Sequence, residues 1–122
     1  MRLVVVDASA IGALIFGEPE ADEIAVRLSN ATMAAPALLW FEVANVCVKK
    51  MRAHPSLREK ISEALALGRN LPIQIVDVDH GETVKLAMKT ELTAYDASYL
   101  WLAQTLGVEI VTLDKMLLKN LT

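Results

Sequence analysis

Four short apolar runs along the chain favour β-strands. The first, Leu-Val-Val-Val, is continuous and β-branched, which is typical of a strand buried on both faces of a parallel sheet. Asp7 ends this run, and Pro36 stops the second one. The predicted strands are residues 3–6, 32–35, 73–78 and 109–112.

Between these runs, apolar residues recur at three- and four-residue spacing, which indicates helices. Small polar residues stand at most of the expected starts, and several are followed three residues later by an acid, the spacing of a capping box. The predicted N-caps are Ser9, Ser56, Asp79, Thr93 and Asp114. The predicted helices are residues 10–16, 20–29, 37–52, 56–68, 79–90 and 93–107, with a short last helix after Asp114.

Strands that alternate with helices predict the α/β class, with a mostly parallel sheet sandwiched between helices. The length of 122 residues is that of one domain, and we find no internal repeat, low-complexity segment or linker. We therefore expect a single domain over residues 1–122.

Composition adds an expectation about assembly and compartment. Hydrophobic residues make up 54% of the chain and the mean hydropathy is +0.39, and surplus apolar surface favours a subunit interface, so we expect a homodimer. The single cysteine, Cys47, excludes an internal disulfide and a cysteine-based zinc site, and it is typical of a reducing cytoplasm. No apolar run approaches the roughly 20 residues of a transmembrane helix, so we expect no membrane association.

The net charge of −3 provides no basic footprint for nucleic acid, which argues against a protein that binds it by charge alone. An enzyme whose metal ions supply the positive charge is not excluded. The candidate chemistry therefore lies in the carboxylates.

Acidic side chains fall where ligands bind in open α/β sheets, at the carboxyl ends of strands. Asp7 directly follows the first predicted strand, and Asp114 lies just past the last. Taken alone, Asp114 is more often an N-cap, Asp96 is more often the acidic member of a capping box, and Glu42 is more often a solvated helix residue. Asp7 is the least ordinary, because a carboxylate at the end of a buried strand needs hydrogen-bond donors or a cation.

If these carboxylates converge, they suit hydrolysis of a phosphodiester. That reaction gathers negative charge, which Mg²⁺ or Mn²⁺ can neutralise while activating water. Such hard ions prefer carboxylate oxygens and water. No softer site competes, because His54 and His80 are far apart and neither has ligand-like spacing to Cys47.

Four segments together resemble the motifs of PIN-domain proteins, particularly VapC-type toxins of toxin–antitoxin pairs. They are LVVVDASAIGALIFGEPEA, PALLWFEVANV, LTAYDASYLWLAQTLG and VTLDKML, and they occur in the family's order over nearly the whole chain. The resemblance implies a three-layer α/β/α fold with a four- or five-stranded sheet, and a ribonuclease activity that depends on Mg²⁺ or Mn²⁺. It further implies an RNA substrate and an antitoxin partner that inserts a basic side chain among the acids.

By the same resemblance, Asp7, Glu42, Asp96 and Asp114 are the catalytic and metal-binding acids. Ser9 and Thr112 match hydroxyl positions beside the first and last acids. Asn45, three residues after Glu42 on one helical face, is a candidate to orient that carboxylate, or an ordinary surface amide.

Two other functions stay open at this point. A receiver-like signalling domain has a similar length, but it needs adjacent acids after the first strand, and Ala8 and Ser9 follow Asp7 here; Asp77 is its candidate phosphoacceptor. A PIN-fold protein without catalysis could act by binding RNA or a partner. Metal-dependent cleavage separates an enzyme from a binder. A haloacid-dehalogenase-type phosphatase is set aside, because DASAI lacks its second aspartate.

Overall fold

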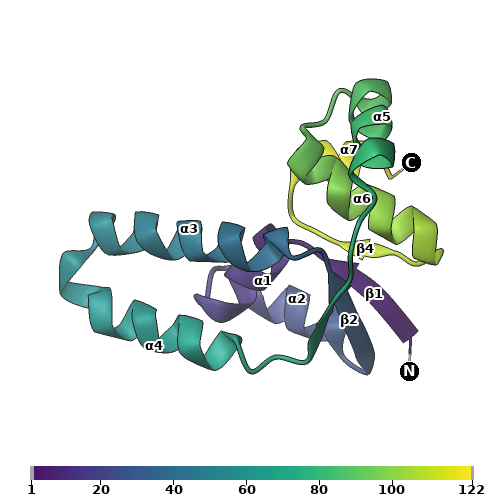
Figure 1. Ribbon diagram of the computed structural model, residues 1–122. Coiled ribbons are helices and arrows are strands. Elements are labelled where there is room, and N and C mark those ends of the chain that lie inside the picture. The colour runs from purple at the N-terminus through teal and green to yellow at the C-terminus, as the bar shows by residue number, and fades with distance from the viewer. Residues whose placement is uncertain (1, 122) are drawn as a thin grey trace.

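The computed structural model describes residues 2–121 and contains a parallel sheet between two groups of helices (Figure 1). The strands are β1 (Arg2–Val6), β2 (Ala31–Ala35), β3 (Ile73–Ile75) and β4 (Ile110–Val111). They lie in the order β3-β2-β1-β4, and every pairing is parallel. The α/β class and the parallel sheet are thus confirmed, with four strands over the described residues.

Seven α-helices and one 3₁₀ helix connect and cover the strands in the described part of the chain. Their bounds are α1 (Ala8–Ile15), α2 (Ala21–Leu28), α3 (Leu38–Ala53), the 3₁₀ helix η1 (Pro55–Leu57), α4 (Arg58–Gly68), α5 (His80–Thr90), α6 (Ala94–Leu106) and α7 (Lys115–Lys119). Figure 1 shows α1 to α4 gathered on one side of the sheet and α5 to α7 on the other, which is the three-layer arrangement.

The core forms where β1 passes between the two helical layers. Val4, Val5 and Val6 are completely buried, as the continuous apolar run predicted. Helix α6 packs on β1 and β4 from one side, and α1 packs against α2, α3 and α4 on the other. Cys47 is buried on α3.

Helices α3 and α4 extend away from the sheet as an antiparallel pair (Figure 1). Gly68 lies at the end of α4, where a Cβ would meet the Cγ1 atom of Ile15 at 2.5 Å. The missing side chain therefore allows α4 to approach α1 closely.

Two predicted helix starts were wrong. Asp7, not Ser9, is the N-cap of α1, because the Asp7 carboxylate accepts the Ala10 N–H and the helix begins at Ala8. Ser56 caps no helix; it lies inside η1, and Leu57 precedes α4 without a side-chain cap. The predicted caps Asp79, Thr93 and Asp114 are confirmed, each accepting a backbone N–H of its helix.

The two outer strands are shorter than predicted. β3 ends at Ile75, although the Val76 N–H still donates to the Ala35 carbonyl at 3.0 Å. β4 pairs on one side only, with Val5 and Val6 of β1. An edge strand has one neighbour and loses regular pairing where the sheet twists away from that neighbour. The apolar pattern of the sequence does not show where this happens. Across residues 2–121, every helix is too short or too polar to cross a lipid bilayer.

Candidate acidic active site

The strand order places the carboxyl ends of β1 and β4 side by side at the point where the chain changes direction across the sheet. β2 and β3 extend from one side of β1, whereas β4 pairs with the other. In open α/β sheets such a switch point is where ligands bind. Asp7 follows β1, and Thr112 and Asp114 follow β4, so all three lie at this point.

Asp7 is only 4% exposed and is held by three donors. Its Oδ1 accepts the Ser9 hydroxyl at 2.7 Å and the Ala10 N–H at 3.1 Å, and its Oδ2 accepts the Thr112 hydroxyl. Burial raises the pKa of the Asp7 carboxyl, the three hydrogen bonds oppose that rise, and the charge of Asp114 adds to it. These bonds fix the carboxylate's orientation.

Ser9 and Thr112 also tie this carboxylate to the turn after β4. The Ser9 Oγ accepts the Leu113 N–H at 2.9 Å, and the Thr112 Oγ1 accepts the Asp114 N–H at 2.9 Å. Both hydroxyls therefore donate to Asp7 and accept from the backbone that leads to Asp114. These hydrogen bonds hold the Asp7 carboxylate beside that turn.

Asp114 begins α7 as its N-cap. Its Oδ1 accepts the N–H groups of Met116 and Leu117 at 2.8 and 3.1 Å. The cap thus uses one carboxylate oxygen and leaves Oδ2 outside these two bonds. Asp114 can therefore cap a helix and contribute charge to the site at the same time.

Glu42 enters from α3, which follows β2. Its Oε1 accepts the phenol of Tyr99 at 2.6 Å, and Tyr99 is a buried residue of α6. Burial raises the pKa of Glu42, the Tyr99 bond lowers it, and the charges of Asp96, Asp7 and Asp114 raise it again. Burial, then the neighbouring Glu42, raises the pKa of the Tyr99 phenol well above its usual range, so the phenol stays a donor.

Asp96 enters from the first turn of α6. Its N–H donates to the Thr93 hydroxyl at 3.1 Å, which is half of the predicted capping box. Burial raises the pKa of its carboxyl first, and the charges of Asp114 and Asp7 raise it further. No hydrogen bond from the described residues opposes these effects on Asp96.

The four predicted acids are thus brought together from α3, α6 and the ends of β1 and β4, and they repel one another electrostatically. Within residues 2–121, however, no three acidic, histidine or cysteine side chains stand as a ready-made metal-binding group. Mg²⁺ and Mn²⁺ prefer oxygen ligands, and the four acids offer only oxygen. A bound cation would also relieve the repulsion among the four carboxylates. The residues therefore fit such an ion chemically, and the full coordination would have to form on binding.

Tyr99 is the site residue that the sequence did not single out. Asn45 was the candidate to orient Glu42, but the hydrogen bond to Glu42 comes from Tyr99, while Asn45 is exposed in the same surface hollow as Glu42 and Ser9. The position of Tyr99, three residues after Asp96 on α6, could have suggested it, since residues at that spacing share a helical face.

Comparisons with known proteins agree with this fold. The model of the PIN domain family matches residues 4–121, and the chain belongs to the PIN-domain family. Among its relatives is Ribonuclease VapC3 of Pyrobaculum aerophilum, which is 33% identical over 96% of this chain and 92% of that protein. The crystal structure of PAE2754 from Pyrobaculum aerophilum superposes with a TM-score of 0.79 at 28% identity, covering 98% of this chain and 84% of that one.

The PIN-domain resemblance, including the VapC type, is therefore confirmed. Family membership leaves no basis for a receiver-like signalling domain. In addition, Asp77 is exposed beyond the short edge strand β3 and lines a hollow with Pro36 and Val78, apart from the Asp7 network.

Proposed function

We propose that this chain is a metal-dependent endoribonuclease and the toxin of a VapBC-type pair. The observation that carries the proposal is the set of four mutually repelling carboxylates around a buried, three-times hydrogen-bonded Asp7 at the switch point of the sheet. The similarity to a protein named a ribonuclease supports the same reaction.

In this proposal Asp7, Glu42, Asp96 and Asp114 hold one or two divalent ions. Mg²⁺ or Mn²⁺, when bound, neutralises charge on the phosphate and makes water a better nucleophile at neutral pH. Ser9 and Thr112 keep Asp7 in one orientation, and Tyr99 does the same for Glu42. Water attacks phosphorus, the bond to the 3′ oxygen breaks, and the products carry 5′-phosphate and 3′-hydroxyl ends.

The test is cleavage of a mixed pool of small RNAs by the purified chain with Mn²⁺, and again with EDTA. Wild type is compared with Asp7→Asn, Asp96→Asn and the matched control Glu63→Gln, an exposed acid of α4. We expect cleavage by wild type and the control only, and only with the metal. Cleavage that survives EDTA or Asp7→Asn contradicts the assignment, and no cleavage by any form favours the PIN-fold binding protein.

The antitoxin partner and the homodimer are further parts of the proposal. A basic side chain of an antitoxin would pair with the acids of the site. Several apolar side chains are more than 70% exposed, which supports a protein contact; they are Val26, Phe41, Leu67 and Met88. Sedimentation gives the mass of the chain in solution, and growth arrest on expression that Asp7→Asn relieves would identify a toxin. A cytoplasmic location stays a prediction.

A further inference from the structure

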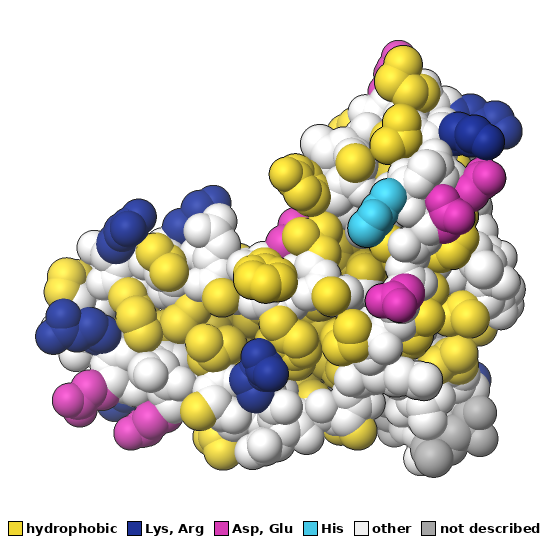
Figure 2. Space-filling model, in the orientation of Figure 1, with side chains coloured by type: hydrophobic (Ala, Val, Ile, Leu, Met, Phe, Trp, Pro, Cys, Tyr) yellow, Lys and Arg dark blue, Asp and Glu magenta, His cyan; other side chains and the backbone are white. Residues whose placement is uncertain are grey.

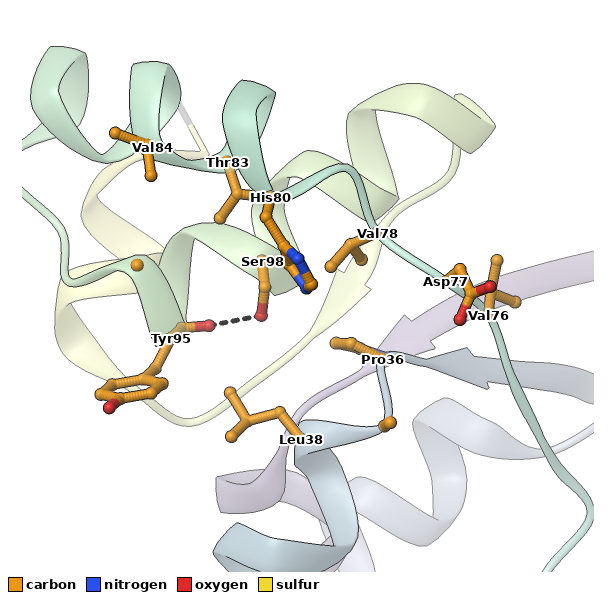
Figure 3. A pocket seen from close by; sticks show the side chains of 12 residues that line it. Pro36, Leu38, Val76, Asp77, Val78, His80, Thr83, Val84, Tyr95 and Ser98 are labelled. Atoms are coloured by element: carbon orange, nitrogen blue, oxygen red, sulfur yellow. Dashed lines mark hydrogen bonds between the residues drawn. The ribbon is translucent and has the colours of Figure 1, made fainter.

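A hollow of about 690 Å³ lies next to the acidic site (Figure 3). Its volume falls within the roughly 300–1,000 Å³ of small-molecule sites. It is formed where the chain leaves β2 and β3, opposite the first turns of α5 and α6. The lining residues used below are Pro36, Leu38, Val78, His80, Tyr95 and Ser98.

This hollow shares a wall with a second one that contains residues of the acidic site. Leu38 and Tyr95 border both, and the second hollow, of about 460 Å³, also contains Ser9, Glu42 and Lys49. The Tyr95 ring stands at the boundary and is 64% exposed. Phe41 of α3 is 76% exposed and borders the second hollow. Figure 2 shows one hollowed face between the α3–α4 pair and the α5–α6 side, with hydrophobic side chains along it.

The walls of the larger hollow suit a flat ligand with polar edges. Pro36, Leu38 and Val78 supply apolar surface, and the His80 ring projects inward (Figure 3). The Ser98 hydroxyl already donates to the Tyr95 carbonyl at 2.6 Å. The His80 ring makes no hydrogen bond to residues 2–121 and is therefore available to a ligand.

Among residues 2–121, one lysine lines either space, and it belongs to the second hollow. Lys49 lies seven residues after Glu42 on α3, on the same helical face, and is exposed. Its neighbour Lys50 is instead paired with Glu18. A cation two turns from the acids can bind a phosphate next to the one being cleaved.

We propose that the larger hollow holds an unstacked base of single-stranded RNA, with Tyr95 stacked on that base and Lys49 bound to a neighbouring phosphate. This deepens the proposed function, on which it rests. An RNA base is favoured over a protein side chain because the hollow borders the one that contains Glu42, and because it combines an exposed aromatic ring, an available imidazole and a nearby cation. Recognition of unstacked bases on aromatic rings is how proteins read single strands.

The experiment measures RNA binding without cleavage. Fluorescence anisotropy in EDTA gives the Kd of a short fluorescein-labelled single-stranded RNA and of an abasic ribose-phosphate strand of equal length. We expect Tyr95→Ala to weaken binding of the RNA by roughly 5- to 150-fold and to leave the abasic strand unchanged. We expect Lys49→Ala to weaken both strands and to reduce the slope of log K against log salt by about 0.7.

Matched controls remove similar side chains outside both hollows. Leu67→Ala removes an exposed apolar side chain of α4, and Lys119→Ala removes an exposed cation of α7; neither should change the Kd. If Tyr95→Ala weakens binding of the RNA and of the abasic strand by the same factor, the stacking role of Tyr95 is overturned. If Tyr95→Ala leaves the Kd of the RNA unchanged but changes the mass of the protein in sedimentation, the hollow is a protein interface, and the proposal is also overturned.

The outcome is separable from that of the proposed ribonuclease. A chain that binds bases through Tyr95 but never cleaves RNA with Mn²⁺ keeps this inference and loses the enzyme. If the wild-type chain cleaves RNA, and Tyr95→Ala binds RNA as tightly as wild type, the proposed ribonuclease stands and this inference fails.

Discussion

The Thr112 hydroxyl donates to the Asp7 carboxylate across 105 positions of sequence. The two residues follow the adjacent strands β4 and β1, and both are nearly inaccessible to water. Because Thr112 also accepts the Asp114 N–H, this one hydroxyl connects the first and the last acid of the site.

Replacing Thr112 by valine should therefore destabilise the fold. The change keeps the shape but leaves a buried carboxylate without one donor, and we expect a loss of about 1–3 kcal/mol in the free energy of unfolding. Urea unfolding at neutral pH in EDTA measures it. Thr105→Val, at an exposed position of α6, is the control and should change little. Equal stability of the two variants would show that the Thr112 bond contributes nothing net.

Stability without metal should fall as the pH rises. The folded-state pKa values of Asp7, Glu42 and Asp96 lie above their ordinary values of 3.8, 4.5 and 3.8. The folded protein thus binds protons more tightly than the unfolded chain. The three protonated carboxyls contribute fully to stability below their ordinary pKa values, and this contribution is lost as the pH rises through their raised pKa values. Urea unfolding in EDTA from about pH 4 to about pH 8 measures this slope.

Asp7→Asn cannot ionise and should flatten that slope, whereas Asp22→Asn, an exposed acid of α2, should keep it. If the stability of Asp7→Asn changed with pH as steeply as that of wild type, burial would not raise the pKa of Asp7, and the carboxyl would be ionised throughout this pH range.

A divalent ion should reverse the destabilisation. Mn²⁺ at 100 times its Kd should add about 2.7 kcal/mol to the free energy of unfolding, and EDTA should remove it. We expect a rise in Tm with Mn²⁺ for wild type and Glu63→Gln, and a smaller rise for Asp7→Asn and Asp96→Asn. The same rise in all four proteins would place the ion elsewhere.

Tyr99→Phe should impair the site without changing its charge. Glu42 would lose the phenol that holds its Oε1, and loss of such a supporting bond typically costs about 10- to 100-fold in metal affinity or activity. RNA cleavage and the Mn²⁺ dependence of Tm measure this effect. Thr105→Val, which removes an exposed hydroxyl of the same helix, is the control for cleavage. Full activity of Tyr99→Phe would show that Glu42 is held by other means.

The prediction from sequence was best where a local rule and burial agree. Val4 to Val6 formed the central strand, and Asp79, Thr93 and Asp114 capped the helices that they were expected to cap. The prediction that Ser9 is an N-cap was wrong, because the Ser9 hydroxyl donates to Asp7 and accepts the N–H of Leu113, which is remote in sequence. Tyr99 was missed for the same reason, since its partner Glu42 lies on another helix.

The sequence by itself determined the α/β class and the approximate positions of the strands and helices, and its motifs singled out the four acids of the proposed site. Those features depend on the period of apolar residues and on residue types, which a single chain displays directly. Only the tertiary structure decided that Ser9 and Thr112 share Asp7, that Tyr99 holds Glu42, and that Tyr95 separates two hollows. These relations join residues on different elements, and they depend on how the sheet order and the packing of α3 and α6 orient side chains in space.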